Sequence, residues 1–285
     1  MSTVWRGRWM VVCAALAWSL SGLFVKLLVS PPSWLGTDLV AAEHIACWRC
    51  LFGALSLVLF LRPASLSWHP LMPLMAGCSA LMNGLFIAAM AMGDVAEASL
   101  LQYTAPFWVF VINVLVLKRA TANRLDGLSL LVATTGITVI VLGRWQEQQL
   151  YPAMLALGAG VAFAGVMLCL SWLQQHNSVW LAFLNQLVAG LIALPWAWHM
   201  PWPGGMAWLV LILFGAIQVA LPNWLLSKAM KLVPAHQAAL ITILDPICAP
   251  LWAWLITQHI PGVTTLLGGS VFLLALMIRY WPRKS

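Results

Sequence analysis

Long apolar runs, separated by short polar or turn-rich segments, cover almost the whole chain. A helix that crosses a bilayer needs about 20 consecutive apolar residues, and runs of that length can be laid along the sequence between turn or charge signals. The joining segments are short, as in "RPASLSWHP" (62–70) and "QQHNS" (174–178). The pattern predicts ten membrane-spanning helices, over residues 10–28, 44–61, 70–92, 96–117, 125–143, 152–173, 178–198, 206–228, 235–257 and 262–281.

The composition agrees with a membrane environment. Hydrophobic residues make up 63% of the chain and charged residues 7%, whereas about a quarter of the residues in a soluble domain are charged. The sequence therefore predicts an all-α polytopic membrane protein with the lipid bilayer as its partner. The net charge of +7 does not indicate nucleic-acid binding, because basic residues flank the cytoplasmic ends of membrane helices in any case.

Lysine and arginine are distributed unequally between the two predicted faces. With a cytoplasmic N-terminus, the outer loops keep only Arg144. Basic residues concentrate on the cytoplasmic side of membrane proteins, so the sequence predicts a multi-pass protein with both termini in the cytoplasm. The short loops favour the bacterial inner membrane. The predicted inner side receives Arg6, Arg8, Arg62, Lys118, Arg119, Arg124, Lys228, Lys231, Arg279, Arg283 and Lys284.

The second half of the chain repeats the first. Asn83 and Asn223, like Pro106 and Pro246, lie 140 residues apart in the sequence. A repeat of five helices inserts its second copy upside down, and inverted repeats with a site near the midplane are typical of secondary transporters. The sequence predicts repeats over residues 1–147 and 148–285.

Four segments resemble a known family: "AALAWSLSGLFVK" (14–26), "CWRCLFGA" (47–54), "AEASLLQYTAPFWVF" (96–110) and "PAHQAALITILDPICAPLWAWL" (234–255). They look like the EamA-type members of the drug/metabolite transporter superfamily. The resemblance implies ten helices in two inverted five-helix repeats around a central cavity, and export of small metabolites such as amino acids, or of drugs. Relatives commonly carry an acidic residue before the second-half proline, where this chain has Asp245.

Prolines are expected to kink the matched helices. A proline lacks the amide proton and clashes with the carbonyl four residues earlier, so Pro106 and Pro246 free the carbonyls of Gln102 and Thr242. Pro250 is a third expected kink. Freed carbonyls at mid-membrane need a cavity or a protein neighbour, and a kink that serves packing alone is the alternative.

Asp245 lies in an otherwise uncharged apolar run. A carboxylate at the centre of a membrane helix costs about 2.5–3.5 kcal/mol on insertion scales. One interpretation is a cavity carboxylate that binds a cationic group or carries a proton. The other is a fixed ion pair, for which Arg49 is the only plausible buried basic partner.

Arg49, in the second predicted span, has two interpretations as well. It could snorkel to the outer interface or pair with Glu43. If it faces the cavity, its planar guanidinium suits a carboxylate, and together with Asp245 it would suit a zwitterion. This pair is the argument for an amino-acid-like substrate.

Further polar and aromatic residues inside the spans are candidates for the cavity wall. Aromatic side chains attract ammonium groups, and intramembrane amides either bind substrate or join helices by hydrogen bonds; core packing is the alternative for the aromatic residues. Gln186 corresponds to Arg49 in the second repeat. The predicted substrate-binding residues are Trp18, Arg49, Asn83, Gln102, Tyr103, Gln186, Asn223, Thr242 and Asp245, with Asp245 as the candidate for proton coupling.

No motif indicates catalysis, a cofactor or a metal. "CWRC" (47–50) lies in an apolar helix, whereas redox CxxC motifs are solvent-accessible; the other cysteines are scattered singly, and no phosphate-binding GxxxxGK[ST] occurs. The predicted function is secondary active transport of a small molecule, proton-coupled or facilitative, most simply export of amino acids or related compounds. The alternatives are an exporter of cationic or aromatic drugs and an intramembrane enzyme acting on lipid or peptide. Monomer and homodimer stay open.

Overall fold

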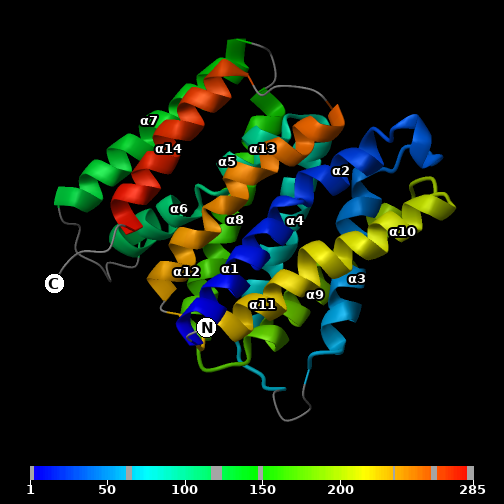
Figure 1. Cartoon of the computed structure of the whole chain (residues 1–285), viewed down its shortest axis with the longest axis horizontal. Helices are drawn as coiled ribbons and strands as arrows, with labels where there is room; N and C mark the ends of the chain where they lie inside the picture. The colour runs from blue at the N-terminus through cyan, green and yellow to red at the C-terminus, as the bar shows by residue number, and fades with distance from the viewer. Residues whose placement is uncertain are drawn as a thin grey trace.

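Helices form every regular element in the described part of a computed structural model, which covers residues 3–61, 66–116, 124–146, 150–233, 235–257 and 262–280. The predicted all-α class is confirmed. The α-helices are α1 (Thr3–Ser19), α2 (Ser21–Val29), α3 (Ala42–Val58), α4 (Met72–Met92), α5 (Val95–Gln102), α6 (Ala105–Val111), α7 (Arg124–Gln146), α8 (Leu150–Trp172), α9 (Ser178–Trp198), α10 (Gly205–Leu213), α11 (Leu221–Ala229), α12 (Ala235–Thr242), α13 (Leu244–Thr257) and α14 (Val263–Tyr280). A short 3-10 helix, η1 (Ser33–Leu35), and two π-helical segments, η3 (Ile112–Val116) and η4 (Phe214–Ala220), complete them (Figure 1).

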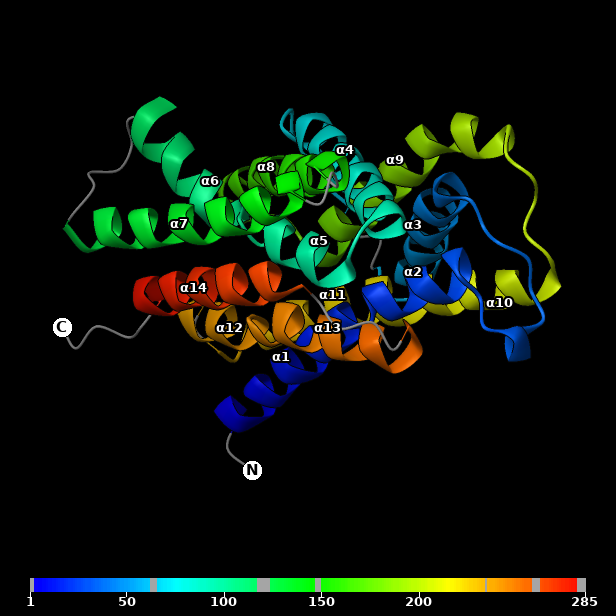
Figure 2. The ribbon, with the colours of Figure 1, turned by 90° about the horizontal axis from the view of Figure 1, so that it is seen from above.

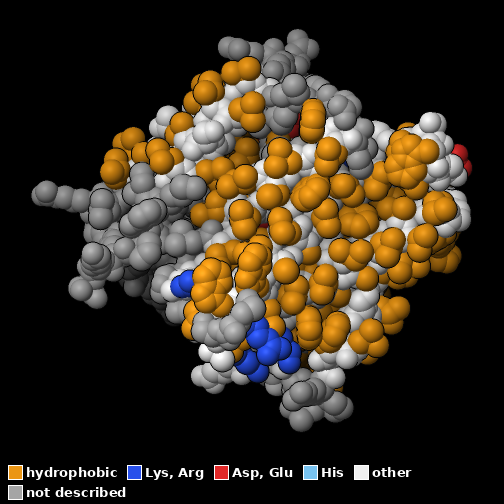
Figure 3. Space-filling view, viewed as in Figure 1, with side chains coloured by type: hydrophobic (Ala, Val, Ile, Leu, Met, Phe, Trp, Pro, Cys, Tyr) orange, Lys and Arg blue, Asp and Glu red, His pale blue; other side chains and the backbone are white. Residues whose placement is uncertain are grey.

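Among the described residues, six helical stretches are long and apolar enough to cross a membrane by length and composition. The other four predicted spans also contain helices, namely α3, α7, α12 with α13, and α14; that all ten cross the membrane stays a prediction. The visible face of the molecule is largely hydrophobic (Figure 3), as expected of a surface that meets lipid tails. The six stretches are Thr3–Val29, Met72–Met92, Val95–Val114, Leu150–Trp172, Ser178–Trp198 and Gly205–Ala229.

Several spans are interrupted rather than straight. The fourth breaks between α5 and α6, just before Pro106, and the ninth breaks at Ile243, between α12 and α13 and just before Pro246. α5 and α12 end at Gln102 and Thr242, which the 140-residue offset matches to each other. The two interruptions therefore fall at the same position of the repeat, as expected where proline cannot continue the helical hydrogen bonds.

The carbonyls at the first interruption face protein. Thr104 donates its hydroxyl proton to the Leu101 carbonyl at 2.6 Å. A Cβ at Gly160 of α8 would lie 2.8 Å from that carbonyl oxygen and 3.3 Å from the carbonyl oxygen of Gln102. The absence of a side chain at Gly160 thus lets α8 pack directly onto the interruption, so the freed backbone here contacts a neighbouring helix.

Helix α3 and segment η4 approach backbone to backbone. A Cβ at Gly215 would lie 2.6 Å from the amide nitrogen of Gly53, and a Cβ at Gly53 would lie 2.6 Å from the side chain of Val219. Small residues permit this close packing of membrane helices. Gly53 lies one turn after Arg49, and Gly215 lies about one turn before Gln218, so the close approach places those two side chains opposite each other.

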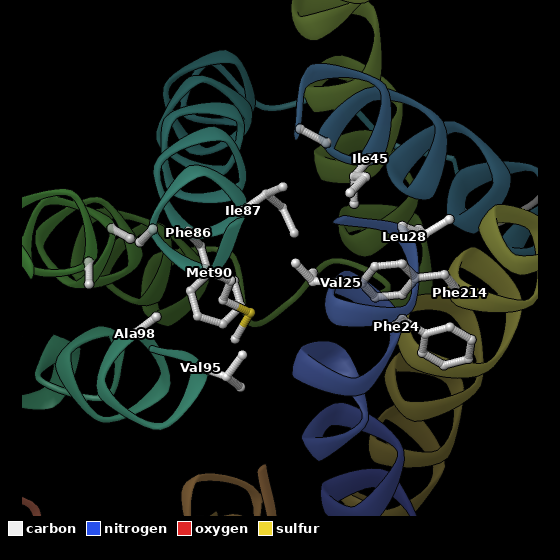
Figure 4. Close-up of a cluster of buried hydrophobic side chains, with 14 of the residues drawn as sticks. Phe24, Val25, Leu28, Ile45, Phe86, Ile87, Met90, Val95, Ala98 and Phe214 are labelled. Atoms are coloured by element: carbon white, nitrogen blue, oxygen red, sulfur yellow. The ribbon is translucent and has the colours of Figure 1, made fainter. Parts of the chain in front are cut away.

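A large apolar cluster joins α2, α3, α4 and the start of η4. The rings of Phe24 and Phe214 stack with their centroids 4.8 Å apart, and Ile45, Ile87 and Met90 are fully buried beside them (Figure 4). The α7 and α14 helices pack along each other at one side of the molecule in both views (Figures 1 and 2). The interrupted spans, α5 with α6 and α12 with α13, lie between these two regions in Figure 1.

Candidate functional site

Arg49 lies one residue from the middle of α3 and is only 3% exposed. Its Nη1 donates to Oε1 of Gln218 on η4 at 3.3 Å, and its Nη2 donates to Oδ1 of Asn83 on α4. Its Cζ lies 5.3 Å from the centre of the Phe214 ring, within the range of a cation–π contact. The guanidinium is therefore held in the interior by two amides and an aromatic face.

Each amide is oriented by a second hydrogen bond. The Nδ2 of Asn83 donates to the Ser79 carbonyl at 2.8 Å, and the Nε2 of Gln218 donates to the Trp18 carbonyl at 3.4 Å. Trp18 precedes the last residue of α1, where carbonyls lack a helical partner. With their donor ends occupied, both amides direct their oxygens at Arg49.

Arg49 has no carboxylate partner among the described residues. Neither Glu43 nor Asp245 forms an ion pair with it, and its burial rules out snorkelling to the interface. Neither of the two ion pairs considered for Arg49, with Glu43 or with Asp245, is formed among the described residues. Its Nε is buried without a hydrogen-bond partner. A buried charge without a counter-ion is costly, and among the described residues the hydrogen-bond acceptors of this one are neutral amide oxygens.

Asp245 forms the second polar site, at the start of α13. Tyr103, the residue after α5, donates its hydroxyl proton to Oδ2 of Asp245 at 2.5 Å. The two residues thus join the interrupted fourth and ninth spans. A short hydrogen bond of this kind to a carboxylate is stronger than one between neutral groups, and it fixes the direction in which the carboxylate points.

The end of α1 lies between the two polar sites. Trp252, two turns beyond Asp245 on α13, donates its Nε1 proton to the buried hydroxyl of Ser19 at 2.8 Å. The neighbouring Trp18 accepts the hydrogen bond from Gln218, which in turn contacts Arg49. Hydrogen bonds through the α1 terminus therefore link the helix that carries Asp245 to the segment that holds Arg49.

Gln186 and Asn223 are not brought into these two sites by any contact among the described residues. Gln186 on α9 has its Oε1 buried without a hydrogen-bond partner. Asn223 donates to the Val219 carbonyl of its own helix at 2.7 Å. Gln102 and Thr242 end α5 and α12. Pro250 lies within α13, and its side chain is outside the described residues.

Sequence reasoning missed Gln218 and Phe214. A signal for the glutamine is present: it is polar in the apolar run "LILFGAIQVALP" (211–222), and Pro222 follows four residues later. A proline at that distance removes the helical partner of the Gln218 carbonyl. Nothing comparable marks Phe214, whose contact with Arg49 depends on how η4 packs.

Comparisons with known proteins agree with this architecture. The EamA-like transporter family matches the chain twice, over residues 5–142 and 150–281. A crystal structure of a protein superposes with a TM-score of 0.65 at 14% identity, over 95% of this chain and 96% of that one, which shows a shared fold.

Two curated relatives carry transporter names. An uncharacterised transporter of Archaeoglobus fulgidus is 27% identical over 196 residues, which are 68% of this chain and 70% of the relative. The pseudopaline exporter CntI of Pseudomonas aeruginosa is 24% identical over 251 residues, which are 86% of this chain and 88% of the exporter. With two matches that together cover most of its length, the chain belongs to the EamA-like transporter family.

Proposed function

We propose that the protein is a secondary exporter that moves a zwitterionic metabolite of amino-acid type across the bacterial inner membrane by alternating access. The observation that carries the proposal is the buried guanidinium of Arg49, which no described carboxylate neutralises. A substrate carboxylate would supply the missing counter-ion. Arginine suits this task because its planar fork can bind both carboxylate oxygens.

The second half of the proposed site is the Tyr103–Asp245 pair. Asp245 is a carboxylate in an apolar helix, and Tyr103 fixes its direction. A carboxylate in such a place binds a cationic group or carries a proton. In the proposed mechanism Asp245 receives the substrate ammonium in one state and a proton in another, so that a proton gradient drives the cycle.

The relatives and the distribution of charge support the proposed direction and setting. The relative from Pseudomonas aeruginosa is named an exporter, which supports export here. Lys and Arg side chains gather near α11 and the N-terminus, at one end of the molecule (Figures 1 and 3). Because basic residues favour the cytoplasmic side, we place both termini in the cytoplasm.

Transport by proteoliposomes tests the proposal. The vesicles contain either the unsubstituted protein or the Asp245→Asn variant. Each receives a labelled neutral amino acid such as L-leucine or, as the competing candidate substrate, a labelled lipophilic cation. Transport is measured with and without a pH gradient. We expect the intact protein to accumulate the amino acid against its gradient. Asp245→Asn should lose this accumulation but keep counterflow, the exchange of label without a net driving force.

Two results would contradict the proposal. If Asp245→Asn accumulates the amino acid as the intact protein does, the carboxylate is a structural partner of Tyr103 and does not couple transport to protons. If only the lipophilic cation moves, the substrate is a cationic drug-like molecule and the zwitterion is wrong.

A further inference from the structure

We infer that Gln218 is a positioning residue that holds Arg49 in place without cancelling its charge, and that it thereby selects substrates that carry a carboxylate. The inference rests on the proposed function, because it takes Arg49 as the group that binds the substrate carboxylate. The inference goes beyond the proposed function by naming Gln218 as the residue that lets this site bind a negatively charged group.

The chemistry of the contact carries the first step. Nη1 of Arg49 donates to the neutral amide oxygen Oε1 of Gln218 at 3.3 Å. A glutamate at position 218 would have the same length and would form an ion pair with Arg49. The second contact, from Asn83, is also a neutral amide. Two amides fix the direction of the guanidinium while its full positive charge stays available to a third partner. The Nε, which lacks a hydrogen-bond partner, offers a donor for it.

The location of the two amides carries the second step. Arg49 and Asn83 both lie in the first family match, and Gln218 lies in the second. A rocking motion of one half against the other therefore separates Arg49 from Gln218 and leaves the bond to Asn83 intact. Nη1 is then released for the substrate carboxylate. Gln218 and the substrate carboxylate alternate at Nη1 during the cycle.

A charge substitution tests the inference. In Gln218→Glu the new carboxylate takes the place of the substrate carboxylate at Arg49. The probes are labelled L-leucine and 3-methylbutylamine, which has the same side chain but no carboxylate. We expect the KM for leucine to rise about 10- to 100-fold, the equivalent of one or two hydrogen bonds to a charged group, while the KM for the amine does not rise.

Two further variants separate charge from structure. Gln237→Glu makes the same change opposite another arginine, since Oε1 of Gln237 accepts from Nε and Nη2 of Arg8 at 3.2 and 3.1 Å, away from the proposed site. Its leucine KM should stay unchanged. Gln218→Met is neutral and of similar length, and its leucine KM should rise far less than that of Gln218→Glu. Equal losses in Gln218→Met and Gln218→Glu would overturn the inference, because shape and not charge would then matter.

A binding measurement does not depend on leucine being the substrate. Sodium acetate, compared with sodium chloride at equal ionic strength, should raise the Tm of the purified intact protein, because a ligand stabilises the state that binds it. Gln218→Glu should show a higher Tm than the intact protein without acetate and no further rise with it. An acetate response that survives in Gln218→Glu would overturn the inference.

The inference and the proposed function fail in different ways. If the intact protein transports no amino acid but shows an acetate response that Gln218→Glu abolishes, the proposed substrate is wrong and the role of Gln218 stands. If leucine is transported with the same KM by the intact protein and by Gln218→Glu, the proposed function stands and the role of Gln218 is wrong.

Discussion

A buried guanidinium held by two amides, as at Arg49, behaves differently from one in an ion pair. An ion pair satisfies itself and resists a competing anion, whereas amide oxygens neutralise nothing. At Asp245 the arrangement is mirrored: a neutral hydroxyl, that of Tyr103, orients a partly buried acid. The two charged residues of the proposed site are therefore each positioned by neutral groups and remain chemically available.

The hydrogen bond between Tyr103 and Asp245 has a measurable stability. Tyr103→Phe removes the donor and leaves a partly buried carboxylate oxygen without it, which should lower the free energy of unfolding by about 1–3 kcal/mol. In an Asp245→Ala background the same change should cost almost nothing, since partners in direct contact are not additive. Thermal unfolding in detergent of the four proteins of this cycle measures the difference.

Tyr151→Phe is the matched control, because Tyr151 is 64% exposed. It should leave the Tm unchanged. Equal effects of Tyr103→Phe in the presence and absence of Asp245 would show that the contact contributes no coupling energy.

At the scale of elements, glycines decide which helices touch. A Cβ at Gly136 of α7 would lie 2.6 Å from the carbonyl oxygen of Gly268 on α14, and a Cβ at Gly268 would lie 2.6 Å from the carbonyl oxygen of Gly136. The obstacle on each side is backbone, which cannot rotate away as a side chain can. This reciprocal contact sets the separation of α7 and α14.

Gly136→Val should push these two helices apart and destabilise the protein by about 1–3 kcal/mol or more, the usual cost of overpacking. Gly84→Val is the control: Gly84 also lies inside a helix, α4, but a Cβ there meets nothing within 4 Å. Comparison of the two Tm values in detergent removes the shared effect of valine on helix propensity. Equal Tm values would mean that α7 and α14 separate without cost.

The helices and the two interruptions next to Pro106 and Pro246 were accessible from sequence, whereas the break between α1 and α2 and the partners of Arg49 were not. Apolar runs mark the helices because lipid requires them, and the prolines mark where α5 and α12 end because they cannot continue a helix. The contact between Arg49 and Gln218 joins residues 169 positions apart. It depends on the backbone approach of Gly53 and Gly215, which no local pattern encodes.

At the scale of the whole molecule, the first span touches both halves at its two ends. A Cβ at Gly22 would lie 3.2 Å from the Cβ of Val95 at the start of α5, and a Cβ at Gly7 would lie 2.8 Å from the Cβ of Leu232, shortly before α12. Alternating access requires one end to open while the other stays closed. The contact of Gly7 with Leu232 joins the two halves and is expected to open when they rock apart, whereas the contact of Gly22 with Val95 lies within the first half and is expected to persist.

A disulfide tests this expectation. Cβ atoms at positions 22 and 95 would lie 3.2 Å apart, slightly closer than the usual distance of about 3.5–4.5 Å in a disulfide. Oxidation of Gly22→Cys/Val95→Cys should therefore lock a contact within the first half and leave transport unchanged, and reduction should not alter the rate. The Val95→Cys variant under the same oxidant controls for the six native cysteines. Loss of transport in the oxidised double variant, reversed by reduction, would show that this contact opens during the cycle and that the first half does not move as one body.

The mid-helix location of Arg49 also constrains how the protein is made. α3 has 17 residues and carries a charge near its middle, and such a charge opposes insertion by the translocon by about 2.5–3.5 kcal/mol. Asn83 is synthesised soon afterwards, on α4, but Gln218 emerges 169 residues after Arg49. α3 is therefore expected to enter the bilayer as a hairpin with α4, and to acquire its final register only when the second half of the chain has been synthesised.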